Sequence, residues 1–165
     1  MRASQKCNSF ISGLGGFTLI EMLMVVAIIG ILTAVAIPSY QASVTRGNRS
    51  VAVAALMDLA NRQEQFRLNN KTYTADLSNL GYTAGLVYSL GGDSAIALDN
   101  NQGVVVSTST ERTYAIKIDS SAANSFSISA VPQLRQADDA ECGTFTLTNG
   151  GARTESGTGT TSDCW

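Results

Sequence analysis

The chain has 165 residues and a mass of 17.3 kDa, which suits one ordinary domain, or one domain with an anchor. It contains no histidine, and this excludes a Ser-His-Asp or Cys-His catalytic centre and any imidazole-ligated metal. A net charge of −2 argues against a general nucleic-acid binder, and charged residues at only 15% argue against wholesale disorder. The three cysteines are too far apart for a Cys₄ or CxxC metal site.

An apolar run from Phe17 to Ile37 dominates the first forty residues. It contains 21 residues and one charge, Glu21. As a helix it would rise roughly 30 Å, enough to cross the hydrocarbon core of a bilayer. The residues before it carry Arg2, Lys6 and no acid, and positive charge ahead of the first apolar segment favours a cytoplasmic N-terminus. The chain after the run is therefore expected in the periplasm or outside the cell.

Three interpretations of this run compete. The first is an ordinary secretory signal peptide, for which Ala34–Ala36 offers a small-x-small cleavage site. The run is longer than a usual signal core, however, and it contains Glu21. The second is a plain membrane anchor, in which the same carboxylate is costly. The third places a cleavage before the apolar run, directly after Gly16.

The segment GGFTLIE, residues 15–21, resembles the class III signal of type IV pilins and the related pseudopilins. The resemblance implies that a membrane prepilin peptidase cuts after Gly16 and N-methylates the new terminus at Phe17. It also implies that Glu21 pairs with the terminal amine of a neighbouring subunit, as an unpaired carboxylate in hydrocarbon seeks a partner. The alternative for Glu21 is that its side chain snorkels to the lipid head groups.

Two residues that weaken this helix lie at positions that also match the family. Pro38 removes a backbone hydrogen bond at the end of the run, and Gly30 weakens the helix earlier. The resemblance implies that the stretch between them kinks or melts in the filament, whereas the simpler reading of Pro38 is a kink alone.

Beyond Pro38 the pattern predicts an amphipathic helix. One face is expected to pack on a core, and it comprises Val44, Val51, Ala55, Leu59 and Phe66. The rest of the helix surface is expected to carry Arg46, Arg49, Arg62, Glu64 and Arg67. The whole helix is predicted from Phe17 to about Leu68, with Asn69-Asn70 as its stop. It would divide into a membrane or filament-core part, 17–38, and an amphipathic part, 39–70.

The segment after the helix also carries a resemblance. Residues 63–66 followed by the YxxDLxxLG stretch from Tyr73 to Gly81 resemble the corresponding region of PilE-like minor pilins. This implies that residues 71–85 are the family's αβ loop, which lies on the filament surface or between subunits. Tyr73, Leu77 and Leu80 are expected to hold the loop against the domain.

From residue 86 the hydrophobic period changes to two. Strands are predicted at Leu86–Leu90, Val104–Thr108, Arg112–Asp119, Ser125–Val131 and Thr144–Leu147. Turn signals are Gly91-Gly92, Asp99-Asn100-Asn101 and Ser120-Ser121, and Pro132 ends a strand. Tyr114, Ile116 and Ile118 alternate with polar residues, as do Phe126, Ile128 and Ala130. One buried and one wet face indicate an antiparallel sheet.

Cys142 and Cys164 are the two cysteines that remain once Cys7 is removed with the leader, residues 1–16. An even count in an exported domain favours a disulfide, which would close the C-terminal tail into a loop. Val131-Pro132, Asp139, Cys142-Gly143-Thr144 and Cys164-Trp165 resemble the C-terminal end of PilE-type pilins. The resemblance implies a sheet domain over 86–165, with residues 142–164 as the family's D-region.

Polar clusters elsewhere give weaker signals. Asp138, Asp139 and Glu141 could bind Ca²⁺, but they lack the alternating spacing of a calcium loop, so we interpret them as a solvated turn. Asp93 and Asp99 are isolated and receive the same interpretation. Arg46 and Arg49 could meet phosphates. However, residues 17–165 carry nine basic and thirteen acidic side chains, a balance of −4 that disfavours generic DNA affinity. The possibility of a local basic patch in the folded domain stays open.

Together these patterns predict an α+β pilin fold, with a long N-terminal helix packed on an antiparallel sheet. The resemblance implies a structural subunit of a type IV pilus, most like a PilE-type minor pilin, with no enzymatic activity, cofactor or metal. Such pili serve adhesion, twitching motility or DNA uptake. The implied partners are other pilin subunits, the prepilin peptidase, the inner-membrane assembly machinery and membrane lipid. The subunit would span the inner membrane once, with its C-terminus periplasmic, before entering an extracellular pilus.

Three alternatives stay open. A pseudopilin of a type II secretion system shares the N-terminal motif, although such subunits often lack a terminal disulfide loop. A DNA-uptake pilin would need exposed basic and aromatic residues on one face. A periplasmic binding module released after Ala36 would lose the membrane helix and any role for Glu21.

Overall fold

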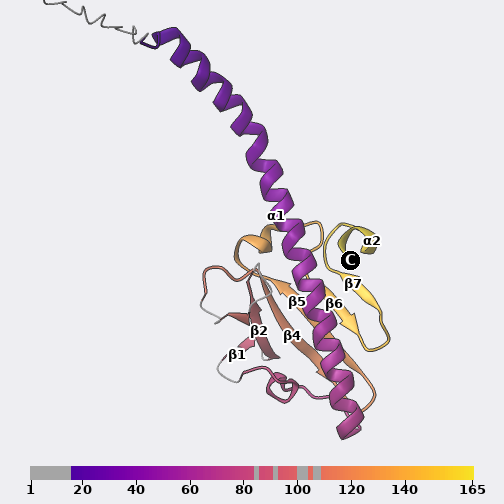
Figure 1. Cartoon of the computed structure of the whole chain (residues 1–165). Helices are drawn as coiled ribbons and strands as arrows, with labels where there is room; N and C mark the ends of the chain where they lie inside the picture. Colours follow the sequence, from indigo (N-terminus) through magenta and orange to yellow (C-terminus); the bar gives the residue numbers. More distant parts are fainter. Residues whose placement is uncertain (1–15, 84–85, 91–92, 100–103, 106–108) are drawn as a thin grey trace, which may run out of the picture. The chain divides into compact units, whose positions relative to one another are not determined.

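The computed structural model describes residues 16–83, 86–90, 93–99, 104–105 and 109–165 (Figure 1). The chain divides into two compact units, Met1–Tyr40 and Gln41–Trp165. The first unit holds the start of helix α1, Leu19–Asn70, and the second holds the rest of α1 together with all the other elements. This long helix, followed by an antiparallel sheet, confirms the predicted α+β fold.

Helix α1 begins and ends within two residues of the prediction. Its C-terminus is Asn70, and the next residue, Lys71, adopts a left-handed conformation with φ 61°. The Lys71 N–H donates to the Arg67 carbonyl at 2.8 Å, the hydrogen bond of an αL cap. The helix runs through both Gly30 and Pro38. The kink expected at these two positions stays a prediction.

A short connection leads from α1 to the sheet and contains the 3₁₀ helix η1, Leu77–Leu80. The Asp76 carboxylate caps η1 by accepting from the Ser78 N–H, and Gly81 ends it at φ 85°. Tyr73, Leu77 and Leu80 are buried, which confirms that they hold this segment to the domain.

The sheet has seven described strands, and every pair is antiparallel. The strands are β1 Val87–Leu90, β2 Asp93–Leu98, β3 Val104–Val105, β4 Tyr114–Ser121, β5 Phe126–Pro132, β6 Phe145–Thr148 and β7 Arg153–Glu155. The order is β1-β2-β4-β5-β6-β7, with β3 paired to β2. In the central pair, Ile116 lies opposite Ala130. Figure 1 shows the second half of α1 lying across one face of this sheet.

The strand predictions hold in part. The strands predicted at Arg112–Asp119, Ser125–Val131 and Thr144–Leu147 correspond to β4, β5 and β6, and Leu86–Leu90 corresponds to β1. Strands β2 and β7 were missed, because Ala95–Leu98 of β2 are all buried and show no alternation, and because β7 has only three residues. Of Val104–Thr108 only β3 is described. The expected turn residues 91–92 and 100–101, and positions 106–108, lie outside the described residues.

The turn predicted at Ser120-Ser121 is wrong. Both serines belong to β4, where a register shift between Ile118 and Ser120 marks a bulge. The chain reverses one step later, where the Ala122 N–H donates to the Ser125 carbonyl at 2.8 Å. Strand β5 ends at Pro132, which confirms the prediction that this proline ends a strand.

The core lies between α1 and the sheet. The buried helix residues are Asn48, Arg49, Val51, Ala52, Leu56, Leu59 and Gln63. Of these, Ala52, Leu56 and Leu59 belong to one core cluster with the predicted inward residues of the central strands, namely Tyr114, Ile116, Ile118, Phe126, Ile128 and Ala130. Val51 and Leu59 are buried as predicted, but Val44 is 39% exposed, which corrects the expected face. The buried face is thus wider than the predicted stripe, and it includes polar residues.

The C-terminal segment closes on itself. After β5 come η2, Leu134–Asp138, then β6, β7 and the short helix α2, Thr161–Cys164. A disulfide joins Cys142 to Cys164, as predicted. In Figure 1, α2 lies beside β7 at the edge of the sheet.

Candidate functional site

The start of α1 is capped by a residue that the sequence reasoning missed. The Thr18 hydroxyl accepts from the Glu21 N–H at 3.3 Å, and the Thr18 carbonyl accepts from Met22. The spacing T-x-x-E is the sequence signature of a capping box and could have revealed it. Within the described part of the chain, the Glu21 carboxylate itself makes no hydrogen bond or ion pair. It is therefore available to a partner from another molecule.

The apolar side chains of the described part of the first unit are exposed. All described residues from 16 to 40 are exposed. The large apolar residues among them are Phe17, Leu19, Ile20, Met22, Leu23, Met24, Val25, Val26, Ile28, Ile29, Ile31, Leu32, Val35, Ile37 and Tyr40. By length and composition α1 could cross a membrane. So large an apolar surface requires lipid or other helices around it.

Two further polar features of this apolar stretch differ in how they are satisfied. The Thr33 hydroxyl donates to the Ile29 carbonyl at 2.7 Å, a bond that lets a hydroxyl enter hydrocarbon cheaply. Pro38 has no N–H to donate, so one carbonyl of the preceding turn lacks its helical partner.

The second unit contains a buried ion pair that contradicts two expectations. Arg49 was expected on the solvated side of the helix, and Asp139 in a solvated turn. Instead the Arg49 guanidinium donates two hydrogen bonds to the Asp139 carboxylate, from Nε to Oδ2 at 2.8 Å and from Nη2 to Oδ1 at 2.7 Å. Their side chains are 10% and 2% exposed. Arg49 is therefore committed to the interior and does not meet phosphates.

Electrostatics reinforce this pair. Burial alone would raise the pKa of Asp139, but hydrogen bonds from Arg49 and from the Cys142 backbone N–H outweigh it and lower that pKa. The hydrogen bond to Asp139, against the opposing effect of burial, raises the pKa of Arg49. The Glu141 carboxylate adds a contact to Arg49 at 2.7 Å from the exposed side. Both members of the pair stay charged at neutral pH.

A network of neutral polar groups extends from the ion pair. Asn48 donates to the Gln136 amide oxygen at 2.9 Å, and the Gln136 amide nitrogen donates to the Tyr114 hydroxyl oxygen at 3.1 Å. Gln136 also donates to Asp139 at 3.3 Å. Burial raises the pKa of Tyr114. Among the described residues, no buried side-chain nitrogen or oxygen lacks a hydrogen-bond partner. The network therefore ties α1 to η2 and the start of the disulfide loop.

The disulfide-closed loop packs tightly on itself. A Cβ at Gly157 would collide with the Glu141 carbonyl, so this approach requires glycine. The Trp165 ring meets Phe145 edge-on, with ring centres 5.4 Å apart, and its Nε1 donates to the Thr154 carbonyl at 3.3 Å. The Arg153 guanidinium lies over the Trp165 ring at 5.5 Å. The loop thus presents a cation and an aromatic ring side by side.

One group of potential metal ligands occurs among the described residues, namely Asp139, Glu141 and Cys142. Cys142 is bound to Cys164, and the two carboxylates already hold Arg49. This arrangement has no thiolate, and both carboxylates already accept hydrogen bonds from Arg49, so the residues do not fit a metal site.

Comparison with known proteins identifies the family. Residues 38–146 match the family model described as type IV minor pilin ComP, DNA uptake sequence receptor. The chain belongs to the type IV pilin family. Residues 15–37 of this pilin match the prokaryotic N-terminal methylation motif, which contains Gly16, Phe17 and Glu21. This is a family of structural pilins, which is not known to be enzymatic.

Individual relatives agree with this family. The wide pilus major component PilA4 of Thermus thermophilus is 46% identical over 65 residues, which cover 39% of the pilin and 50% of PilA4. A fimbrial protein of Pseudomonas aeruginosa is 37% identical over 93 residues, covering 53% and 60%. The major pilin PilE of Neisseria gonorrhoeae is 33% identical over 93 residues, covering 56% and 54%. The pilin thus spans about half to three-fifths of these relatives, and none of them is a pseudopilin.

Proposed function

We propose that this pilin is a minor subunit of a type IV pilus, of the PilE type. Prepilin peptidase cuts it after Gly16 and methylates Phe17, and the domain stands on the periplasmic side of the inner membrane until the assembly machinery extracts it. The observation that carries the proposal is the exposed apolar surface from Phe17 to Ile37, which lies within the methylation motif matched at residues 15–37. An ordinary signal peptide is discarded, whereas a helix retained after cleavage at Gly16 serves first as an anchor and then as a filament core.

Glu21 is the residue that sets the position of each subunit in this proposal. Its carboxylate lies in the first turn of α1, near the amine that cleavage would create at Phe17. In hydrocarbon an unpaired carboxylate is costly, so the amine of a neighbouring Phe17 is a favourable partner. Residues 17–38 would then form the filament core, and residues 71–85 and 142–164 would face neighbouring subunits or the surroundings.

The test of this role is the variant Glu21→Ala in cells that assemble the pilus. We expect normal processing to Phe17 but loss of the variant from sheared filaments, because the charge pairing is gone. Glu111→Ala, which removes an exposed carboxylate of the second unit, is the matched control and should enter filaments normally. Normal incorporation of Glu21→Ala would refute the role.

A second candidate function is DNA reception at the pilus surface. The description of the matched family favours it. Arg49, Arg62 and Lys117 pair with carboxylates and are less suited to phosphate contacts. Arg153 is exposed, and its guanidinium stacks on Trp165 on the disulfide loop. This is the basic and aromatic combination that a DNA-binding pilin requires.

DNA reception is tested by fluorescence anisotropy of duplex DNA with the processed full-length pilin. Arg153→Gln should weaken binding and reduce the dependence of log affinity on log salt by about one contact. Arg46→Gln removes the same charge from an exposed position on α1 and should have a smaller effect. Equal effects of the two variants would show non-specific attraction and would remove the disulfide loop as the DNA site.

A further inference from the structure

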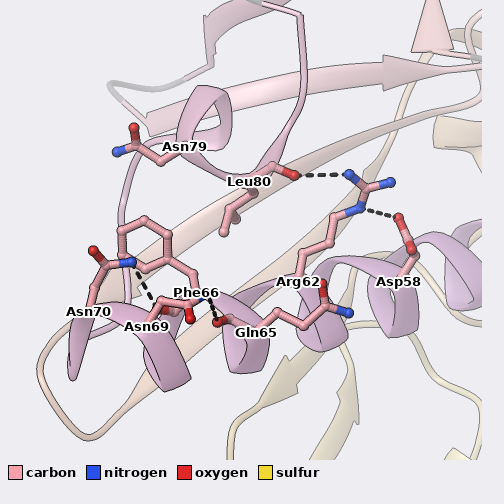
Figure 2. Close-up of a pocket in the computed structure, with 8 residues that line it drawn as sticks. All are labelled: Asp58, Arg62, Gln65, Phe66, Asn69, Asn70, Asn79 and Leu80. Atoms are coloured by element: carbon pink, nitrogen blue, oxygen red, sulfur yellow. Dashed lines mark hydrogen bonds and ion pairs between the residues drawn. The ribbon is translucent and has the colours of Figure 1, made fainter.

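A polar cavity lies between the last turns of α1 and the 3₁₀ helix η1. It has a volume of about 440 Å³, within the range of roughly 300–1,000 Å³ that is usual for small-molecule sites. Figure 2 shows Asn79 and Leu80 on one side and the α1 side chains on the other. The α1 residues that line it are Asp58, Arg62, Gln65, Phe66, Asn69 and Asn70. We call this site the amide pocket, because four of its eight residues carry a side-chain amide.

The amides leave hydrogen-bonding capacity unused. The side-chain nitrogen of Asn70 donates to the Phe66 carbonyl at 3.0 Å, and that of Asn69 to the Gln65 carbonyl at 3.2 Å. Asn79 donates to the Thr74 hydroxyl at 3.2 Å. Within the described part of the chain no donor reaches the amide oxygens of these asparagines, and the Gln65 amide makes no hydrogen bond. The pocket therefore offers both acceptors and donors to a ligand.

The one cation in the pocket is already neutralised. Arg62 Nε lies 2.7 Å from Asp58 Oδ2, and Arg62 Nη1 donates to the Leu80 carbonyl at 2.9 Å. Tyr82, whose ring lies 4.8 Å from the guanidinium, donates its hydroxyl to Asp58 at 3.3 Å. Burial and the charge of Asp58 raise the pKa of Tyr82 to about 12, so this hydroxyl keeps its proton. An anion such as a phosphate gains little here, because Asp58 opposes it.

The inner side of the pocket is apolar and fixed. Leu80 is buried, and the half-buried Phe66 packs against the core. Gly81 follows in a left-handed conformation, and a Cβ there would lie 3.2 Å from Arg62 Nη1. Glycine thus lets the guanidinium reach the Leu80 carbonyl. The pocket combines an aromatic side chain, an aliphatic floor, several amides and no net charge.

We propose that the amide pocket binds a neutral saccharide. Vicinal hydroxyl groups both donate and accept, so they match amide side chains such as Asn70 and Asn79 on opposite sides of the pocket. The C–H face of a pyranose ring can lie on Phe66, since an aromatic ring carries negative charge on its face. The residues that line the pocket include neither Glu21 nor any residue of the disulfide loop. The pocket therefore adds a ligand to this pilin beyond filament assembly and DNA reception.

The test uses the processed full-length pilin in a detergent without a sugar head group. An array of neutral and sialylated oligosaccharides is screened first, and the best neutral oligosaccharide is then titrated by calorimetry. We expect measurable binding of neutral sugars, with no gain from sialic acid. Asn79→Ala should weaken the affinity about tenfold, the effect of losing one or two hydrogen bonds.

Asn61→Ala is the matched control, because Asn61 is an exposed amide of α1 outside the pocket. It should bind sugar as the wild type does, and both variants should unfold at the wild-type temperature. Absence of neutral-sugar binding by the wild type would overturn the proposal, as would unchanged binding by Asn79→Ala. If a sialylated sugar or duplex DNA bound more tightly than the neutral sugar, and this binding depended on Asn79, the proposal that the ligand is a neutral saccharide would be overturned.

Two sources could supply such a sugar, a glycan on another cell surface or one attached to a neighbouring pilin subunit. Treatment of sheared filaments with glycosidases separates them. If a neighbouring subunit supplies the sugar, glycosidase treatment should empty the pocket and increase binding of the added oligosaccharide. If the sugar comes from outside, binding should stay the same.

Discussion

In the first unit of this pilin, apolar side chains such as Ile31 and Leu32 are more than 60% exposed, whereas in the second unit the charged Arg49 and Asp139 are buried together. The second unit satisfies its own polar groups and covers its own core. In the first unit, every described residue from 16 to 40 is exposed. The difference teaches that only the second unit gains stability from its own packing. The first depends on lipid or on other subunits.

The largest expected effect tests the buried pair. Asp139→Ala should lower the free energy of unfolding by about 3–5 kcal/mol, because it leaves the Arg49 guanidinium buried without its main partner. Chemical denaturation of the processed pilin in detergent measures this. Asp138→Ala, which removes the exposed neighbouring carboxylate, should change stability by less than about 0.5 kcal/mol. A loss below about 1 kcal/mol for Asp139→Ala would show that Glu141 is a sufficient partner.

The same truncation made in both units sharpens the comparison. Leu56 is fully buried and Leu32 is 64% exposed. Leu56→Ala should cost about 2–5 kcal/mol, because it removes packed methyl groups and leaves a cavity. Leu32→Ala should leave unfolding of the second unit within about 0.5 kcal/mol of wild type. Equal losses in the same denaturation experiment would contradict the division of roles.

Sequence patterns predicted the helix, the central strands and the disulfide because each has a strong local signal. Alternation in Tyr114–Ile118 gave the buried face of β4, and the apolar run gave the first half of α1. The burial of Arg49 could not be predicted, because its partner Asp139 lies 90 residues away in sequence. From helical periodicity alone, an arginine is assigned to the solvent-exposed face of a helix unless its buried partner is known.

In the candidate sites, too, local motifs could be predicted from the sequence, whereas contacts between separate elements could not. The motif at Gly16, Phe17 and Glu21 is local, and a sequence reader can find it. The amide pocket joins α1 to η1, and its lining residues Asn70 and Asn79 come together only through the fold of the connection between these two helices. The Thr18 cap is the exception, a local signal that was overlooked.

The pH dependence of unfolding follows from the lowered pKa of Asp139. The unfolded chain, with an ordinary aspartate pKa near 3.8, binds this proton more readily than the folded chain does. The stabilisation is therefore complete above the unfolded pKa and is lost as pH falls through the lower, folded pKa. Unfolding free energies measured from neutral to acidic pH should show this loss for the wild type. Asp139→Asn should lack this component, and an unchanged acid dependence would contradict the assignment.

The smallest expected effect concerns the end of α1. Lys71 adopts φ 61°, a conformation that costs less for glycine than for a residue with a Cβ. Lys71→Gly should therefore raise the unfolding free energy by about 0.5–1 kcal/mol. Denaturation midpoints at constant m-value measure the gain. Thr72→Gly, at the next position, serves as the control and should give no gain.

Mass spectrometry of the first peptide of this pilin in sheared filaments tests the central claim most directly. We expect a peptide that begins at N-methylated Phe17, in low abundance relative to the major subunit. A peptide that begins at Ile37, or a processed pilin found in membranes but absent from filaments, would contradict it. The first result would indicate a released periplasmic module, and the second a pseudopilin.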